Sequence, residues 1–273
     1  MNYVWFFLGA LWYTLGAIVI CGLAVSLCRA LFIRMMGNGF GRGVVITTSM
    51  VGTPIHELGH AIMCILFGHR ITDMSLWQPR SKDGNLGFVT HTYKKKNPYH
   101  ILGNLFISVG PIFSGMAVIT LALLLGFPTV FADYTTAAAD LTSSGQGGFA
   151  LVGEGLRILP RIVEELTDKT PATPLWGQII TLIVILSVSQ HISLSPADVK
   201  VGSTALPLYG LLILALTVIC GLMGQPVMDD VTAALRLFSG YVTALFTVVM
   251  VASLIQLILA LPVWLIRMLT GRA

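Results

Sequence analysis

Hydrophobic residues in this chain gather in long runs that are separated by short polar segments. An apolar run of about 20 residues is long enough to cross a bilayer as a helix. The first run lacks a basic start and is too long for a signal peptide, so it is interpreted as a retained helix. The pattern predicts an all-α polytopic membrane protein with about six transmembrane helices. The predicted spans are residues 3–28, 44–68, 99–127, 174–194, 205–224 and 239–265.

Residues 69–98 have a different pattern, in which two β-prone runs flank Lys82-Asp83-Gly84-Asn85. An Asp-Gly pair between such runs is typical of a β-hairpin. The edge strand of a hairpin can pair with an extended peptide, although a hairpin can also do no more than join two helices. We therefore expect a small β-hairpin after the helix at 44–68, and both roles stay open for it.

Composition and charge agree with a membrane protein. The chain is 55% hydrophobic and 10% charged, whereas a soluble protein is about 25% charged. The net charge of +4 comes without a Lys/Arg cluster interleaved with aromatic residues, which argues against a nucleic-acid partner. The four cysteines lie in apolar runs without CxxC spacing, which argues against disulfides and thiolate zinc sites.

The charges of the polar segments predict the orientation. Segment 69–98 holds six of the sixteen basic residues, and such segments face the cytoplasm in most membrane proteins. Segment 128–173 holds six acidic and three basic residues and fits the opposite side. Arg29, Arg34 and Arg42 follow the first helix and disagree with this assignment, which leaves the orientation of that helix open. We expect a multi-pass protein of the cell membrane with a cytoplasmic hairpin.

The candidate chemistry lies in His56-Glu57-Leu58-Gly59-His60, inside the second apolar run. Residues four apart share one face of a helix, so both imidazoles can bind one metal ion. Glu57 is then placed to take a proton from the water that the metal activates. Each ionisable side chain near the bilayer centre costs about 2.5–3.5 kcal/mol, and a divalent metal compensates this cost. With a cytoplasmic hairpin, the three residues lie roughly 12–18 Å from the cytoplasmic end of their helix.

A catalytic metal site generally takes a third protein ligand and leaves one position for water. The two candidates in apolar surroundings are Asp198 and His191. Asp198 also fits a helix start, because Ser195 suits the N-cap, Pro196 the first position and Asp198 the third. His191 can instead hydrogen-bond to a neighbouring helix. The chemistry of water-activating zinc favours Asp198 without excluding His191.

A further polar residue, Asn104, lies in a stretch rich in small residues. Gly103, Gly110 and Gly115 predict close packing with another helix. Asn104 can hold the water at the metal, a substrate backbone or a neighbouring helix, and the last of these is the commonest use of such a residue.

Together these residues resemble the site-2 protease class of intramembrane zinc metalloproteases, the M50 peptidase family. The resemblance covers about 44–203 and implies one Zn²⁺ per chain, with His56 and His60 as ligands, Glu57 as catalytic base and Asp198 as third ligand. The chain departs from the family where Ser-Pro-Ala-Asp-Val-Lys-Val-Gly replaces an Asn/Pro-rich stretch that ends in Asp-Gly, and it shows no PDZ or CBS module.

The resemblance implies a zinc-dependent endopeptidase that hydrolyses peptide bonds in or near the transmembrane segments of membrane-protein substrates. Two alternatives are a catalytically silent metalloprotease-like membrane scaffold and an ion or metal transporter. A scaffold has no need of Glu57, and a transporter should carry more acidic or histidine residues along the bundle than His191.

The expected parts are an N-terminal helix with a basic connector, a metalloprotease core and two C-terminal helices. Their bounds are 1–43, 44–203 and 204–273, and the core comprises the helix at 44–68, the hairpin loop 69–98, the helix 99–127, the acidic loop 128–173 and the helix 174–203.

Overall fold

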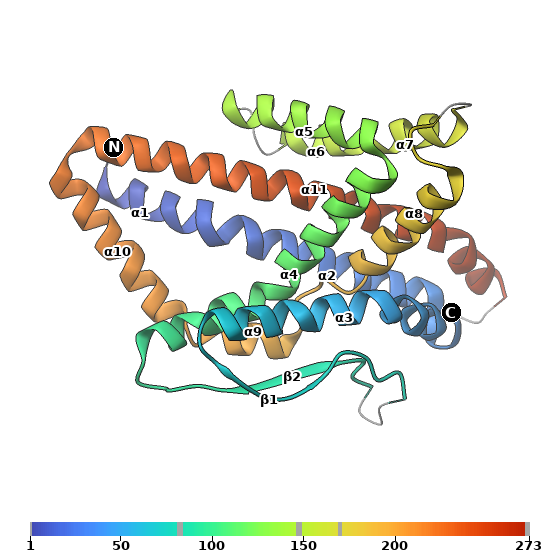
Figure 1. Cartoon of the computed structure of the whole chain (residues 1–273), viewed down its shortest axis with the longest axis horizontal. Helices are drawn as coiled ribbons and strands as arrows, with labels where there is room; N and C mark the ends of the chain where they lie inside the picture. The colour runs from blue at the N-terminus through green and yellow to red at the C-terminus, as the bar shows by residue number, and fades with distance from the viewer. Residues whose placement is uncertain (1, 81–83, 146–148, 169–170, 271–273) are drawn as a thin grey trace.

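The computed structural model describes residues 2–80, 84–145, 149–168 and 171–270, and most of them are helical. Figure 1 shows the arrangement of the helices and of one two-stranded sheet. The helices are α1 (Tyr3–Leu11), α2 (Ala17–Met36), α3 (Arg42–Leu66), α4 (Pro98–Gly126), α5 (Pro128–Ser143), α6 (Phe149–Leu156), α7 (Ile158–Thr167), α8 (Leu175–Ser189), α9 (Pro196–Ser203), α10 (Leu206–Met223) and α11 (Gln225–Leu269). Two π-helical turns, η1 (Trp12–Gly16) and η2 (Gly37–Gly41), join α1 to α2 and α2 to α3.

Four helical segments of the described chain are long and apolar enough to cross a membrane. They are Tyr3–Met36, α4, α10 and α11. This supports a helical membrane protein, but the predicted count of six spans is not confirmed. The helix α8 has 15 residues, or about 22 Å against a hydrocarbon core of about 30 Å. The helix α3 is long enough, but His56, Glu57 and His60 make it less apolar.

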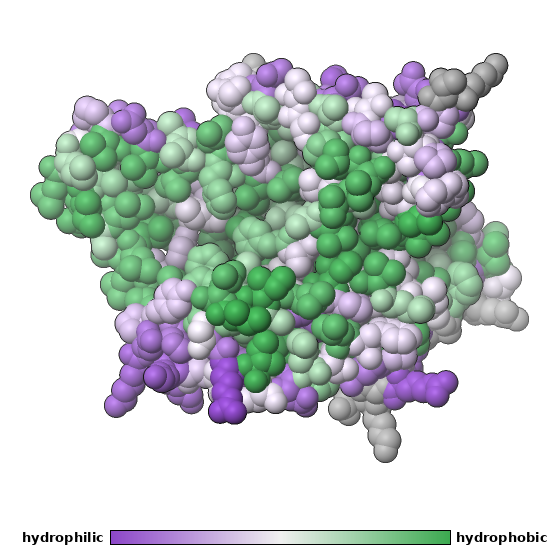
Figure 2. Space-filling view, viewed as in Figure 1, coloured by the Kyte–Doolittle hydropathy of each residue, from purple (hydrophilic) through white to green (hydrophobic). Residues whose placement is uncertain are grey.

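The surface of the molecule carries an apolar band between two polar rims (Figure 2). In this view, polar side chains gather at the upper edge, where α5, α6 and α7 lie, and at the lower edge, where the sheet lies. We call the upper edge, formed by α5, α6 and α7, the acidic rim. We call the lower edge, formed by the sheet and by α3 and α9 beside it, the hairpin rim. A band of apolar side chains between polar edges is the distribution that a bilayer favours.

Close helix packing builds the interior. The helix α11 runs along α2, and α4 contacts α3, α8 and α9. A Cβ atom on Gly59 would lie 2.6 Å from the Gly110 carbonyl oxygen, so only glycines let α3 and α4 come this close. Cβ atoms on Gly103 and Gly115 would also meet neighbours within 2.6 Å. Gly110 therefore packs against a helix as predicted, whereas Gly103 and Gly115 pack against Phe67 and Ile192, which follow α3 and α8.

The segment 128–173, predicted as an acidic loop between membrane helices, forms α5, α6 and α7 in its described residues. Pro128 starts α5 with a preset backbone angle, and Tyr134, Leu151 and Ile158 are buried in the main core. The tyrosine hydroxyl donates a hydrogen bond to the Ala244 carbonyl of α11. This burial depends on α11, which is distant in sequence.

Within the part predicted over 174–203, the helix ends at Ser189 and a new helix begins at Pro196. Ser195 and Pro196 set the start of the new helix, as the helix-start pattern predicts. The break matters because it makes α9 a separate short helix that carries Asp198.

The predicted β-hairpin is present. Strand β1 (Arg70–Ser75) pairs antiparallel with β2 (Phe88–Thr92), with Arg70 opposite Thr92 and Ser75 opposite Phe88. Of the predicted turn, Lys82 and Asp83 lie outside the described residues, and Gly84 has a φ of +75°, which favours glycine.

The hairpin lies along α3 (Figure 1). Beyond β1, the indole Nε1 of Trp77 donates a hydrogen bond to Ser49 Oγ of α3 at 2.9 Å. Before β2, a Cβ atom on Gly87 would lie 2.8 Å from Cγ of Glu57. The hairpin backbone therefore rests directly on the face of α3 that carries Glu57.

Candidate metal centre

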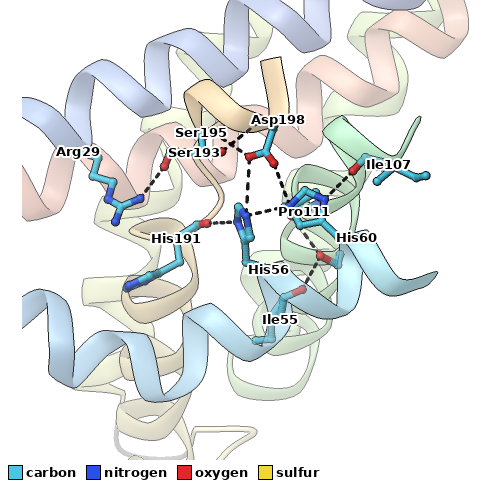
Figure 3. Close-up of polar contacts among 11 residues, drawn as sticks. Arg29, Ile55, His56, His60, Ile107, Pro111, His191, Ser193, Ser195 and Asp198 are labelled. Carbon is cyan, nitrogen blue, oxygen red and sulfur yellow. Dashed lines mark hydrogen bonds and ion pairs between the residues drawn. The ribbon is translucent and has the colours of Figure 1, made fainter. Parts of the chain in front are cut away.

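His56 and His60 lie one turn apart on α3, and each ring is held by a backbone carbonyl. His56 Nδ1 lies 2.6 Å from the His191 carbonyl oxygen, and His60 Nδ1 lies 2.7 Å from that of Ile107 (Figure 3). A carbonyl oxygen only accepts, so each Nδ1 carries the hydrogen and each Nε2 keeps a lone pair. The two Nε2 atoms are 3.2 Å apart.

Asp198 reaches the same point from α9. The Ser195 Oγ accepts a hydrogen bond from the Asp198 backbone N–H, and the Ser195 N–H donates to Asp198 Oδ2 at 2.9 Å. The predicted capping box is therefore confirmed. The other carboxylate oxygen, Oδ1, lies 3.2 Å from His60 Nε2, and Oδ2 lies 4.0 Å from His56 Nε2. Capping the helix and facing the two histidines are thus compatible.

This arrangement fits a metal ion such as zinc. The ligand atoms of His56, His60 and Asp198 lie within 4.8 Å of one another. Zinc–nitrogen bonds of 2.0–2.1 Å in a tetrahedron place ligand atoms about 3.3 Å apart. The two distances of 3.2 Å match this edge, and the third, from His56 Nε2 to Asp198 Oδ2, is 4.0 Å. Two nitrogen lone pairs repel each other at this distance, and a cation between them removes the repulsion.

Glu57 lies beside this group and borders two cavities. Its side chain is buried, and its carboxylate makes no hydrogen bond to any residue that the structure describes. The first cavity has a volume of 280 Å³ and is lined by His56, Glu57, His60, Asp198 and residues of β2. The second has a volume of 230 Å³ and lies on the side of α2. A free carboxylate at a cavity beside a metal group can move a proton.

The other two candidate residues from the sequence are His191 and Asn104. Their side chains are not part of the group whose ligand atoms converge. The His191 ring lies 3.0 Å from the Ser187 carbonyl oxygen through Nδ1, and its backbone oxygen orients His56. The Asn104 amide donates to Thr204 Oγ1 at 2.9 Å and so connects α4 to the end of α9. The described contacts therefore give His191 an orienting role and Asn104 a packing role.

Two cavity residues were missed by the sequence analysis as parts of the site. Arg29 of α2 lines the 230 Å³ cavity, and an arginine in an apolar run is a signal that could have found it. His91 of β2 lines the 280 Å³ cavity. Its Nδ1 lies 3.0 Å from His69 Nδ1, and His69 Nε2 donates to the His100 carbonyl at 2.8 Å. Because His69 Nδ1 is then an acceptor, His91 donates to it and keeps a lone pair on Nε2.

No protein-family model, curated protein or solved structure matches this chain. The assignment of the site therefore depends on its residues and their geometry.

Proposed function

We propose that this protein is an intramembrane zinc metalloprotease that hydrolyses peptide bonds in or near transmembrane segments of membrane proteins. One observation carries the proposal: two histidine Nε2 lone pairs and a carboxylate converge beside a buried glutamate that borders a cavity. The resemblance to the site-2 protease class has the same residues in the same roles.

His56, His60 and Asp198 would hold the zinc ion, which supplies a Lewis acid for the scissile carbonyl and acidifies a water molecule. Glu57 takes the proton of the attacking water and delivers it to the leaving amine. The carbonyl oxygens of His191 and Ile107 hold the histidines in the tautomer that this chemistry requires.

The hairpin would hold the substrate. A helical substrate hides its carbonyls in its own hydrogen bonds, so it must be extended before cleavage. Residues Gly87, Phe88, Val89 and His91 line the cavity beside Glu57. In the described part of the chain the sheet has two strands, which leaves one edge of β2 available for an extended peptide. The basic residues of 69–98 favour a cytoplasmic position for this rim and its active site.

In a catalytically silent scaffold, a proton shared by His60 and Asp198, instead of a metal ion, would remove the repulsion between the Nε2 lone pairs. Zinc content per chain separates these two explanations. We expect about one zinc in detergent-purified wild type, and its loss in the variants His56→Ala and Asp198→Ala. Asp140→Ala, which changes an exposed aspartate of α5, is the matched control and should keep the metal.

Catalysis is tested with Glu57→Gln, which removes the base and keeps the shape of the side chain. This variant should bind zinc like wild type and should not cleave a transmembrane substrate that wild type cleaves. Wild type without zinc after reconstitution, or full cleavage by Glu57→Gln, would overturn the proposal. Zinc-dependent transport into vesicles that survives this substitution would support the transporter instead.

A further inference from the structure

Arg29 brings a positive charge to the edge of the candidate metal centre. It belongs to the apolar helix α2, and its Nη1 donates a hydrogen bond to Ser193 Oγ at 2.8 Å (Figure 3). Its guanidinium makes no ion pair with any residue in the described ranges. The 230 Å³ cavity that it lines is also lined by His56, Glu57 and His191.

No described residue around this cavity forms an ion pair with Arg29. Asp198 is the aspartate of the candidate metal centre, and its carboxylate faces His56 and His60. The guanidinium therefore lines the cavity without an ion-pair partner among the described residues. An unpaired charge in apolar surroundings is costly, and a bound anion would lower this cost.

We propose that the cavity beside Arg29 binds a carboxylate of the substrate peptide, an inference that rests on the proposed function. The planar guanidinium matches a carboxylate with two parallel hydrogen bonds. The two cavities share His56, Glu57, Asn85, Gly87 and Ser195, so they adjoin at the catalytic base. A substrate carboxylate on Arg29 therefore lies close to the scissile bond. The substrate class is a peptide with an acidic side chain, or a free C-terminus, near the cleaved bond.

Binding to the zinc-loaded Glu57→Gln protein in lipid nanodiscs tests this proposal without turnover. The probes are apolar octapeptides in matched pairs: Glu against Gln at one internal position, and a C-terminal acid against its amide. We expect one acidic member to bind about 10- to 100-fold more tightly than its neutral partner. A preference in the first pair identifies a side chain, and a preference in the second identifies the chain end.

Four further substitutions assign the acid preference to the guanidinium. In the Glu57→Gln background, Arg29→Gln should abolish the preference for the acidic probe. Arg29→Glu should reverse this preference in favour of a peptide with Lys at the varied internal position. Arg34→Gln changes an exposed arginine of the same helix and should leave it intact. Ser193→Ala removes the hydrogen bond that Arg29 donates within the described chain but keeps its charge, so most of the acid preference should remain.

Equal binding of acidic and neutral probes, or an acid preference that survives Arg29→Gln, would overturn the proposal. Failure of the proposed function has a different signature, namely no zinc in wild type or cleavage that survives Glu57→Gln. The peptide titration is repeated on zinc-free protein. A preference that depends on Arg29 in that sample keeps the carboxylate site even where the peptidase assignment fails.

Discussion

The two polar rims of this molecule both gather carboxylates around a cavity, but only one of them builds a metal group. At the acidic rim, Asp133, Glu164, Glu165 and Asp168 line a cavity of 570 Å³. At the hairpin rim the cleft has two carboxylates, Glu57 and Asp198. Among the residues that the structure describes, His56, His60 and Asp198 are the group whose ligand atoms converge. The larger number of acids therefore does not make the better metal site.

The difference lies in what holds each side chain. At the hairpin rim, a carbonyl orients each histidine and Ser195 orients the carboxylate. At the acidic rim, Glu154 forms ion pairs with Arg157 and Arg161, each at 3.0 Å. Neither carboxylate oxygen of the buried Glu165 has a hydrogen-bond partner in the described chain. Oriented ligands lose little freedom when they bind an ion, whereas no hydrogen bond in the described chain orients the Glu165 carboxylate.

The largest predicted effect on stability and zinc content comes from a substitution that forces α3 away from α4. In Gly59→Val the new side chain would overlap Ser114 and the Gly110 carbonyl, because a Cβ alone lies 2.5 and 2.6 Å from them. We expect a loss of about 3 kcal/mol of stability, and loss of zinc because His60 moves away from the Ile107 carbonyl. Thermal unfolding in detergent and zinc analysis measure the two effects.

The matched change at the acidic rim is Gly153→Ala in α6, where a new Cβ meets no atom within 4 Å. It should leave zinc content and stability near those of wild type, since alanine favours a helix over glycine. Full zinc content in Gly59→Val would show that the centre does not depend on this helix contact.

A smaller effect is expected when the orientation of Asp198 is weakened. Ser195→Ala removes the hydroxyl that caps α9, which costs about 1 kcal/mol of stability and loosens the turn whose Ser195 N–H holds the Asp198 carboxylate. Zinc affinity should fall by about 10-fold, the lower end of the usual cost of losing an outer contact to a ligand, because the Ser195 N–H is kept. Competition with a chelator of known affinity measures it. Ser203→Ala, at the other end of the same helix, should leave the affinity unchanged.

The sequence predicted the parts of this centre that depend on local geometry. The spacing of His56 and His60 places both on one helix face, and Ser195-Pro196 starts α9 wherever that helix lies. The meeting of α3 with α9 is tertiary, so chemistry alone left Asp198 and His191 as alternatives. His191 acts through its carbonyl oxygen, and a backbone atom has no signature in a sequence.

The core packing of the acidic rim was missed for a related reason. Leu151 and Ile158 are buried in the main core, where Val249 of α11 also lies, and this burial cannot be read from a polar segment alone. Arg29 was treated as a membrane-flanking charge, because only the packed structure brings α2 beside the segment that carries Ser193.

The smallest predicted effect is a difference between the two rims in how their stability depends on pH. Burial lowers the pKa of His69 and His91 below the ordinary value of 6.5, so unfolding takes up protons there. Their contribution to stability is present above about pH 6.5 and is lost as the pH falls. Burial raises the pKa of Glu165 above 4.5, so its contribution is present below about pH 4.5 and is lost as the pH rises.

Acidification should therefore loosen the hairpin rim and tighten the acidic rim. Amide hydrogen exchange between about pH 7.5 and 4.5, corrected for the intrinsic rate, should show β2 losing protection while α7 keeps or gains it. Glu165→Gln should remove the pH response of α7, and His91→Gln should reduce that of β2 without affecting α7. A parallel response of both rims would mean that global unfolding, and not these buried groups, sets the pH dependence.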